Sequence, residues 1–258
     1  MQYDGSTYGD RIADVYDELH TESELGPVEP VVAFLKDLAG GGPALELGIG
    51  TGRVALPLRE AGVEVHGIDA SQRMVERLRS KPRGTDIPVR MGDFADFSIA
   101  ERFRLVYVVF NTIFGLLSQE EQVTCFSSVA RHLTDDGKFV VEAFVPDPAL
   151  FTRRQRVSAR TVDVDEVVLD VGTLDPTNGR VDAQQIVLRD GDVRLYPVKL
   201  RFAFPSELDL MARLAGLRLR ERWAGWDRAP FEPASGKHVS VYELDPSSRG
   251  VRPPSSVS

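Results

Sequence analysis

The chain has 258 residues, of which 42% are hydrophobic, and this is enough for one large α/β domain with a sizeable buried core. Its formal net charge of −8 at pH 7 argues against nucleic acid or an anionic membrane as the main partner, because both would require a basic face. The single cysteine, Cys125, excludes an internal disulfide framework and is typical of a reducing, cytoplasmic location. We also expect no signal peptide and no segment long enough to span a membrane.

Helical and strand patterns alternate along the first 144 residues. Residues 8–19 and 28–38 place apolar side chains at helical spacing. Five short apolar runs predict strands, at residues 44–47, 63–69, 87–91, 104–110 and 138–144. The segments between them read as helices, one capped by Ser71 and another opened by a capping box of Ser118 and Glu121. This alternation predicts a parallel sheet with helices on both faces.

The alternation of helical and strand patterns ends after residue 148. Residues 161–171, 180–189 and 193–204 read as three strands, and Asp190-Gly191 is a hairpin signal, so a small antiparallel sheet is expected as an insertion. A helix at 206–215 and strands at 217–223 and 238–244 then complete the chain. We therefore predict four parts: N-terminal helices and a cofactor-binding core (1–148), the inserted sheet as a substrate lid (149–204), a return to the core (205–245) and a disordered tail (246–258).

A glycine-rich loop follows the first predicted strand. Glycine lets a ligand lie against bare backbone, and the helix after the loop, expected to begin near Gly52, would point free N–H groups at that ligand. Asp69 ends the second strand, where a carboxylate can accept hydrogen bonds from both hydroxyls of a ribose. A dinucleotide fingerprint started at Gly48 would need a small residue in place of Arg53. The motif therefore predicts a cofactor that has a ribose but no pyrophosphate.

The pattern Glu46-x-Gly48-x-Gly50-x-Gly52, with Asp69 and Asp93 after the next two strands, resembles class I S-adenosylmethionine-dependent methyltransferases. The resemblance covers residues from about 8 to 244 and implies a Rossmann-like sheet, with the glycine loop on the methionine part of S-adenosylmethionine. It also implies the ribose at Asp69, the adenine at Asp93 and Phe94, and the sulfonium end beside Phe110 and Asn111. The cofactor contacts expected in all are Tyr8, Tyr16, Glu46, Gly48, Gly50, Gly52, Asp69, Ala70, Met74, Asp93, Phe94, Phe110 and Asn111.

A closer resemblance is to bacterial sugar N,N-dimethyltransferases of antibiotic pathways. Residues 8–20 look like the N-terminal helix of that group, in which a tyrosine matching Tyr16 reaches over the cofactor. Glu142 matches an acid at the end of the fifth strand, and residues 235–237 look like a segment near nucleotide phosphates. The resemblance implies Tyr16 and Glu142 as catalytic residues. The substrate contacts that we expect are His20, Phe114, Trp226 and Lys237.

The chain also departs from that group, because Gly115 replaces a histidine and Ala143-Phe144 replace two tryptophans. These departures argue against a nucleotide-sugar acceptor. The more general prediction, a methyltransferase that acts on a small molecule, does not depend on these residues. We expect methyl transfer to an amine of a secondary metabolite or amino sugar, by a monomer or homodimer without a metal site. O-methylation and cofactor binding without turnover remain alternatives. Tyr16 could equally be a core residue, and Glu142 could pair with an internal arginine that holds the strand in place.

Overall fold

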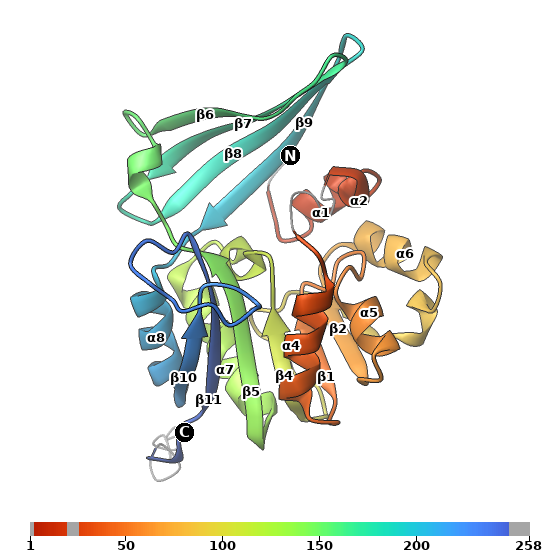
Figure 1. The fold of residues 1–258 in the computed structure, drawn as a ribbon, viewed down its shortest axis with the longest axis vertical. Helices are drawn as coiled ribbons and strands as arrows, with labels where there is room; N and C mark the ends of the chain where they lie inside the picture. The colour runs from red at the N-terminus through yellow and green to blue at the C-terminus, as the bar shows by residue number, and fades with distance from the viewer. Residues whose placement is uncertain (1–2, 20–25, 248–258) are drawn as a thin grey trace, which may run out of the picture.

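The central sheet of the computed structural model, which describes residues 3–19 and 26–247, has the strand order β10-β11-β5-β4-β1-β2-β3 (Figure 1). Strands β1 to β5 pair in parallel, whereas β11 runs antiparallel to β5 and to β10. The strands are β1 (Ala44–Leu47), β2 (Val65–Asp69), β3 (Val89–Met91), β4 (Phe103–Val108), β5 (Leu133–Phe144), β10 (Leu217–Trp223) and β11 (Lys237–Leu244).

Helices cover both faces of this sheet, as the alternating pattern predicts. Buried side chains of α4, α5 and α6 pack on one face with Leu105 and Tyr107, and those of α7 and α8 pack on the other with Val106 and Val108. The helices are α1 (Thr7–Ile12), α2 (Tyr16–Leu19), α4 (Glu29–Ala39), α5 (Ala55–Glu60), α6 (Gln72–Ser80), α7 (Gln119–His132) and α8 (Pro205–Leu214). Short 3-10 turns are η1 (Gly84–Asp86), η2 (Thr112–Gly115) and η3 (Pro148–Leu150). The expected fold class is therefore confirmed.

Local capping signals are confirmed as well. The Ser71 hydroxyl accepts a hydrogen bond from the Met74 N–H at the start of α6. Ser118 and Glu121 form the reciprocal capping box of α7. Both caps satisfy N–H groups that a helix leaves unpaired at its first turn, which is why they can be read from sequence.

The inserted sheet is separate and antiparallel, with the order β6-β7-β8-β9, and lies beyond the carboxyl edge of the central sheet (Figure 1). Its strands are β6 (Gln155–Val162), β7 (Glu166–Asp175), β8 (Arg180–Arg189) and β9 (Asp192–Arg201). The single strand predicted at residues 161–171 is wrong. Val162 pairs with Val167, because the chain reverses direction through the exposed residues between them.

Several other bounds differ from the sequence prediction; the strands expected at residues 104–110 and 193–204, for example, end at Val108 and Arg201. The helix expected at residues 8–19 is broken between α1 and α2, and Ile12 and Tyr16 both pack on the same apolar cluster. The helix after the glycine loop begins at Ala55, so Gly52 is not its first residue. Strand β5 begins at Leu133 rather than at residue 138. The part of the predicted tail from residue 248 onward lies outside the described residues.

Candidate cofactor and acceptor site

The glycine loop between β1 and α5 has left-handed backbone at Gly48 (φ +72°), Gly50 (φ +56°) and Gly52 (φ +80°). A Cβ on Gly48 would lie 2.4 Å from Thr112 Cγ2, so this glycine is required for packing against the loop after β4. A Cβ on Gly50 would meet nothing closer than the Gly48 carbonyl oxygen at 4.0 Å. The loop is therefore open to a ligand at Gly50, as the cofactor prediction requires.

We predict that Gly50→Val abolishes cofactor binding and lowers stability by only about 1–2 kcal/mol, because a branched residue resists positive φ and fills the open space. Gly62→Val is the matched control, since Gly62 also has positive φ (+93°) and has nothing within 4 Å of an added Cβ, but lies outside the loop. Titration calorimetry with S-adenosylmethionine measures the difference. Normal binding by the Gly50 variant would show that the loop does not touch the cofactor.

Asp69 anchors the glycine loop to the end of β2. Its Oδ2 accepts a hydrogen bond from the Gly50 N–H at 2.7 Å, and its Oδ1 accepts one from the Ser71 N–H at 2.8 Å. Burial raises the pKa of Asp69, and the backbone hydrogen bonds from Ser71 and Gly50 oppose this effect. The carboxylate is thus oriented by backbone amides, and each oxygen retains a lone pair with which it can accept a further hydrogen bond from a ligand.

Glu46 on β1 is buried, with 3% of its surface exposed. The Tyr107 hydroxyl donates a hydrogen bond to its Oε2 at 3.0 Å. Burial raises the pKa of Glu46 to about 8, although the Tyr107 hydrogen bond and the nearby Arg53 guanidinium oppose the rise. Arg53 lies over the Phe110 ring, with its guanidinium carbon 5.8 Å from the ring centre. The cofactor-side acid is therefore largely protonated at neutral pH in the ligand-free protein.

This shift predicts a pH-dependent stability. The unfolded chain ionises Glu46 near pH 4.5 whereas the folded protein keeps the proton until about pH 8, so stability should fall as pH rises through that window. We expect the loss to be on the order of a few kcal/mol. Glu46→Gln should remove this component, because the amide oxygen can still accept from Tyr107 and does not titrate. Urea unfolding of both proteins at several pH values measures it, and parallel curves would contradict the assignment.

The turn after β4 is held in a strained conformation. Phe110 (φ 54°) and Asn111 (φ 63°) both have left-handed backbone. The Asn111 side-chain oxygen accepts a hydrogen bond from the Phe144 N–H at 2.7 Å, which ties the turn to the end of β5. Two adjacent non-glycine residues with positive φ cost about 1–3 kcal/mol each, and such strain clusters at functional sites. This turn faces the glycine loop through Thr112, where the sulfonium end is expected.

Glu142 on β5 supports the same turn. Its Oε2 accepts the Phe110 N–H at 2.9 Å, and its Oε1 accepts the Trp226 indole N–H at 2.9 Å. The Trp226 ring packs edge-on against Phe34 of α4, with centroids 5.4 Å apart. Glu142 therefore bonds to a backbone amide and an indole, whereas the sequence-based alternative had assigned it an internal arginine. Its role as a base stays a prediction, and its contacts also fit a residue that positions Phe110.

The N-terminal helices lie between the glycine loop, α6 and the inserted sheet. Tyr8, Tyr16, Val15 and Leu19 pack around the buried cluster formed by Ile12, Ala13, Met74, Val168, Val187 and Tyr196. Burial raises the pKa of Tyr16 to about 12; Arg53 opposes this rise, and the carboxyl groups of Glu46, Asp17 and Asp69 add to it. Tyr16 is therefore a neutral phenol near the glycine loop, and Tyr8 stands on the side of the inserted sheet.

Three aspartates, which the sequence analysis missed, fasten these helices. The Asp10 carboxylate accepts from the Ser71 hydroxyl at 2.6 Å, and Asp14 pairs with Arg73. Asp17 accepts from the Thr51 hydroxyl at 2.7 Å and forms an ion pair with Lys81 at 2.8 Å. Their spacing at positions 10, 14 and 17 is that of one helical face, and this acidic stripe was the signal available in the sequence.

The remaining cofactor residues lie along the same edge. Phe94 Cε1 would be 3.7 Å from a Cβ on Gly48, so the ring lies beside the glycine loop. Exposed Asp93 accepts the Ala95 N–H at 2.8 Å and does not cap a helix. Ala70 and Asp93 both lie within 4.0 Å of a Cβ on Gly5. Met74 is buried beneath α1, and its contact with a cofactor stays a prediction.

The predicted substrate residues are not all at the surface. Phe114 is fully buried and packs edge-on against Phe144, with ring centroids 4.9 Å apart, so it presents no surface to a ligand in this conformation. Lys237 begins β11 opposite Phe144, at the carboxyl end of β5. His20 lies outside the described residues.

Within residues 3–19 and 26–247, no helix is long and apolar enough to cross a membrane, and no group of three or more potential ligands could hold a metal ion.

Comparison with known proteins places this geometry in a family. A methyltransferase domain family matches residues 44–137, the segment with the glycine loop, Asp69 and Asp93. The solved CcbJ methyltransferase from Streptomyces caelestis is 39% identical with a TM-score of 0.88, covering 94% of this chain and 100% of that protein. The cypemycin N-terminal methyltransferase of a Streptomyces species is 29% identical over 93% of this chain and 98% of its own length.

A third relative, from Streptomyces fradiae, is the N,N-dimethyltransferase of dTDP-3-amino-3,6-dideoxy-alpha-D-glucopyranose. It is 29% identical over 52% of this chain and 54% of its own length. The whole-length match to the CcbJ methyltransferase shows the family, and the open glycine loop with its anchored acid fits the cofactor of that family. The chain belongs to the S-adenosylmethionine-dependent methyltransferases.

Proposed function

We propose that this methyltransferase acts on an amine of a small molecule or peptide-derived secondary metabolite. The observation that carries the proposal is the similarity to the cypemycin N-terminal methyltransferase, which extends over 93% of this chain and 98% of that protein. The acceptor amine must reach the methyl group as a neutral nucleophile, and the Tyr16 phenol, with a pKa of about 12, lies near the glycine loop as a neutral hydrogen-bond partner. The names of the cypemycin and amino-sugar relatives, both N-methyltransferases, support the same choice.

Bound S-adenosylmethionine supplies an electrophilic methyl group on a sulfonium. Gly48, Gly50 and Asp69 would hold it, because the loop is open at Gly50 and the carboxylate can accept additional hydrogen bonds. The protein then has to position a neutral amine in line with that methyl group. The Tyr16 phenol, with a pKa of about 12, can accept a hydrogen bond from the amine but is not a base at neutral pH.

Among the described residues that we assign to the site, the carboxylates near Tyr16 have other partners: Asp17 pairs with Lys81, and Asp69 accepts from the Gly50 N–H. Glu46 is buried against Tyr107, and both carboxylate oxygens of Glu142 accept hydrogen bonds. We therefore infer that the amine loses its ammonium proton before it binds, and that catalysis is mainly positioning. In that case the pH dependence of kcat/KM follows the pKa of the acceptor amine.

The test is a panel of acceptors assayed for S-adenosylhomocysteine release and for the methylated product by mass spectrometry. The panel pairs primary and secondary amines, short peptides with free N-termini and amino-sugar glycosides with phenols and alcohols of matching size. Turnover confined to amines supports the proposal, and turnover confined to phenols would replace it with O-methylation. Tight cofactor binding without any product across the panel would favour the non-catalytic alternative.

A further inference from the structure

Gln185 interrupts an apolar strand face of the inserted sheet. The pairing registers of β8 place Val181, Ala183, Gln185 and Val187 on the inner face, which looks toward the N-terminal helices and the central sheet (Figure 1). Only 4% of the surface of Gln185 is exposed. Its side-chain nitrogen is buried and has no hydrogen-bond partner among the described residues. Buried amide groups are normally hydrogen-bonded, so this N–H₂ group suits a ligand that brings the missing acceptor.

Gln185 lies between two apolar clusters that border the predicted cofactor site. Val187, two residues further along β8, belongs to the cluster on which Tyr16 packs. Ala183, two residues earlier, packs on the cluster that also includes Phe144, the last residue of β5. The carboxamide of Gln185 therefore faces the region between the Tyr16 phenol and the end of β5, where we expect the acceptor amine.

An ion pair extends the cross-strand row of Gln185. Asp170 of β7 and Tyr196 of β9 are its direct neighbours in the two strand pairings. The Arg160 guanidinium donates to both carboxylate oxygens of Asp170 at 3.1–3.2 Å. Burial raises the pKa of Tyr8, and the charges of Arg160 and Asp170 also act on this phenol, so Tyr8 lies near the row. Because the ion pair is neutral overall, the row favours an uncharged polar group over an anion.

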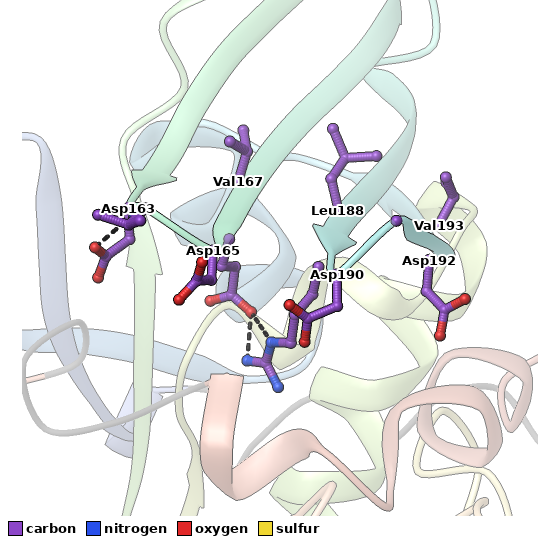
Figure 2. A pocket seen from close by; sticks show the side chains of 11 residues that line it. Asp163, Asp165, Val167, Leu188, Asp190, Asp192 and Val193 are labelled. Carbon is purple, nitrogen blue, oxygen red and sulfur yellow. Dashed lines mark hydrogen bonds and ion pairs between the residues drawn. The ribbon is translucent and has the colours of Figure 1, made fainter.

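The acidic hollow at the tip of the inserted sheet is a different surface (Figure 2). It lies between the turns β6–β7 and β8–β9 and carries four exposed aspartates: Asp163, Asp165, Asp190 and Asp192. Arg189, which also lines it, is paired with Glu166. Among the described residues that line this hollow, none has a buried polar side-chain atom without a partner. The inner face is therefore the better place for a ligand.

We propose that the inner face of the inserted sheet binds the acceptor, with the Gln185 N–H₂ group donating a hydrogen bond to an uncharged oxygen of that molecule. This inference rests on the proposed function, since it takes an amine as the methylated group. Val187, which shares a cluster with Tyr16, lies about 7 Å from Gln185 along the strand. Two hydrogen bonds and a two-carbon unit bridge such a span. The acceptor class is thus an α-amino carbonyl compound or a β-amino alcohol.

The test compares three amines that share one skeleton. Phenylglycine amide carries a carbonyl group beside the amine-bearing carbon, phenylglycinol carries a hydroxyl group there, and 1-phenylpropylamine carries neither. Calorimetry measures their binding to the full chain saturated with S-adenosylhomocysteine. Wild type should bind the two oxygen-bearing amines roughly tenfold more tightly than 1-phenylpropylamine.

Gln185→Met removes the N–H₂ group and keeps a side chain of similar length. This variant should bind the two oxygen-bearing amines roughly tenfold more weakly than wild type does, and should bind 1-phenylpropylamine within twofold of wild type. Comparing variant with wild type for each amine cancels the differences in amine basicity. The matched control is Gln184→Met, which makes the same change at the next residue of β8, on the opposite face of the sheet. Its three affinities should equal those of wild type.

Thermal melting separates recognition from a structural role. An unpartnered buried polar group destabilises the free protein, so Gln185→Met should keep or raise the melting temperature. A glutamine that only holds the sheet in place would give the opposite result, with a lower melting temperature and equal weakening of all three amines. That pattern would overturn the inference.

Methyl transfer from S-adenosylmethionine to the same three amines is followed separately by mass spectrometry. Binding with the expected preference but without methylated product would contradict the proposed function and leave recognition by Gln185 standing. Wild-type protein that binds the three amines equally, or binds none of them, would overturn the inference. A Gln185→Met protein that keeps the wild-type preference would overturn it as well.

Discussion

Asp69→Ala should lower the affinity for S-adenosylmethionine by roughly 100-fold or more while the central sheet remains folded. The variant would remove the two charge-assisted hydrogen bonds that we expect Asp69 to accept from the ribose, each worth about 1.5–3 kcal/mol. It also frees the Gly50 N–H, which Asp69 holds at 2.7 Å, and so loosens the loop that we expect to meet the methionine part. Calorimetric titration with the cofactor measures the loss directly.

The control is Asp136→Ala, which removes an exposed carboxylate paired with Arg104, near the start of β5 and outside the site. Its affinity for the cofactor should equal that of wild type. Asp69→Asn keeps one side-chain oxygen that can accept a hydrogen bond but loses the charge. Its affinity for the cofactor should therefore lie between those of wild type and Asp69→Ala. Unchanged affinity in Asp69→Ala would mean that the ribose is bound elsewhere.

Glu142→Gln should lower single-turnover methylation by roughly 100-fold or more and leave cofactor affinity within a few-fold of wild type. A glutamine has one acceptor oxygen where Glu142 has two. Either the Phe110 N–H or the Trp226 indole N–H would then face an amide N–H₂ group. We expect a displaced Phe110 turn to misalign the acceptor with the methyl group. Melting and single-turnover rate are measured on the same sample.

A second variant separates positioning from proton transfer. Trp226→Phe removes the indole donor but leaves the Glu142 carboxylate in place. If Glu142 positions the turn, both variants should be slow and should keep the pH profile of wild type. If Glu142 is a base, only the Glu142 variant should move the profile. A stable Glu142→Gln protein with wild-type turnover would exclude both roles.

The cofactor class and the main fold were readable from the sequence, because their signals are local. Gly48, Gly50 and Gly52 follow a buried strand within a few residues, and Asp69 comes at the end of the next strand. Parallel strands separated by helices end at one edge, so this order alone brings the loop and the acid together. The structure adds the 2.7 Å contact between Asp69 and Gly50 that makes them one unit.

The contacts that distinguish this site depended on tertiary structure, because their partners are distant in the chain. Glu142 and Trp226 are separated by 84 positions, and they meet only because β11 pairs with β5 and the loop before it folds over the sheet. Asp17 reaches Thr51 across 34 positions once α2 packs on the glycine loop. Phe114 is apolar, so its sequence context fits a pocket wall and a core position equally well. Only the structure shows that its ring is packed against Phe144. Sequence periodicity determines which face of an element is apolar, whereas the partner of that face is decided by how the elements pack.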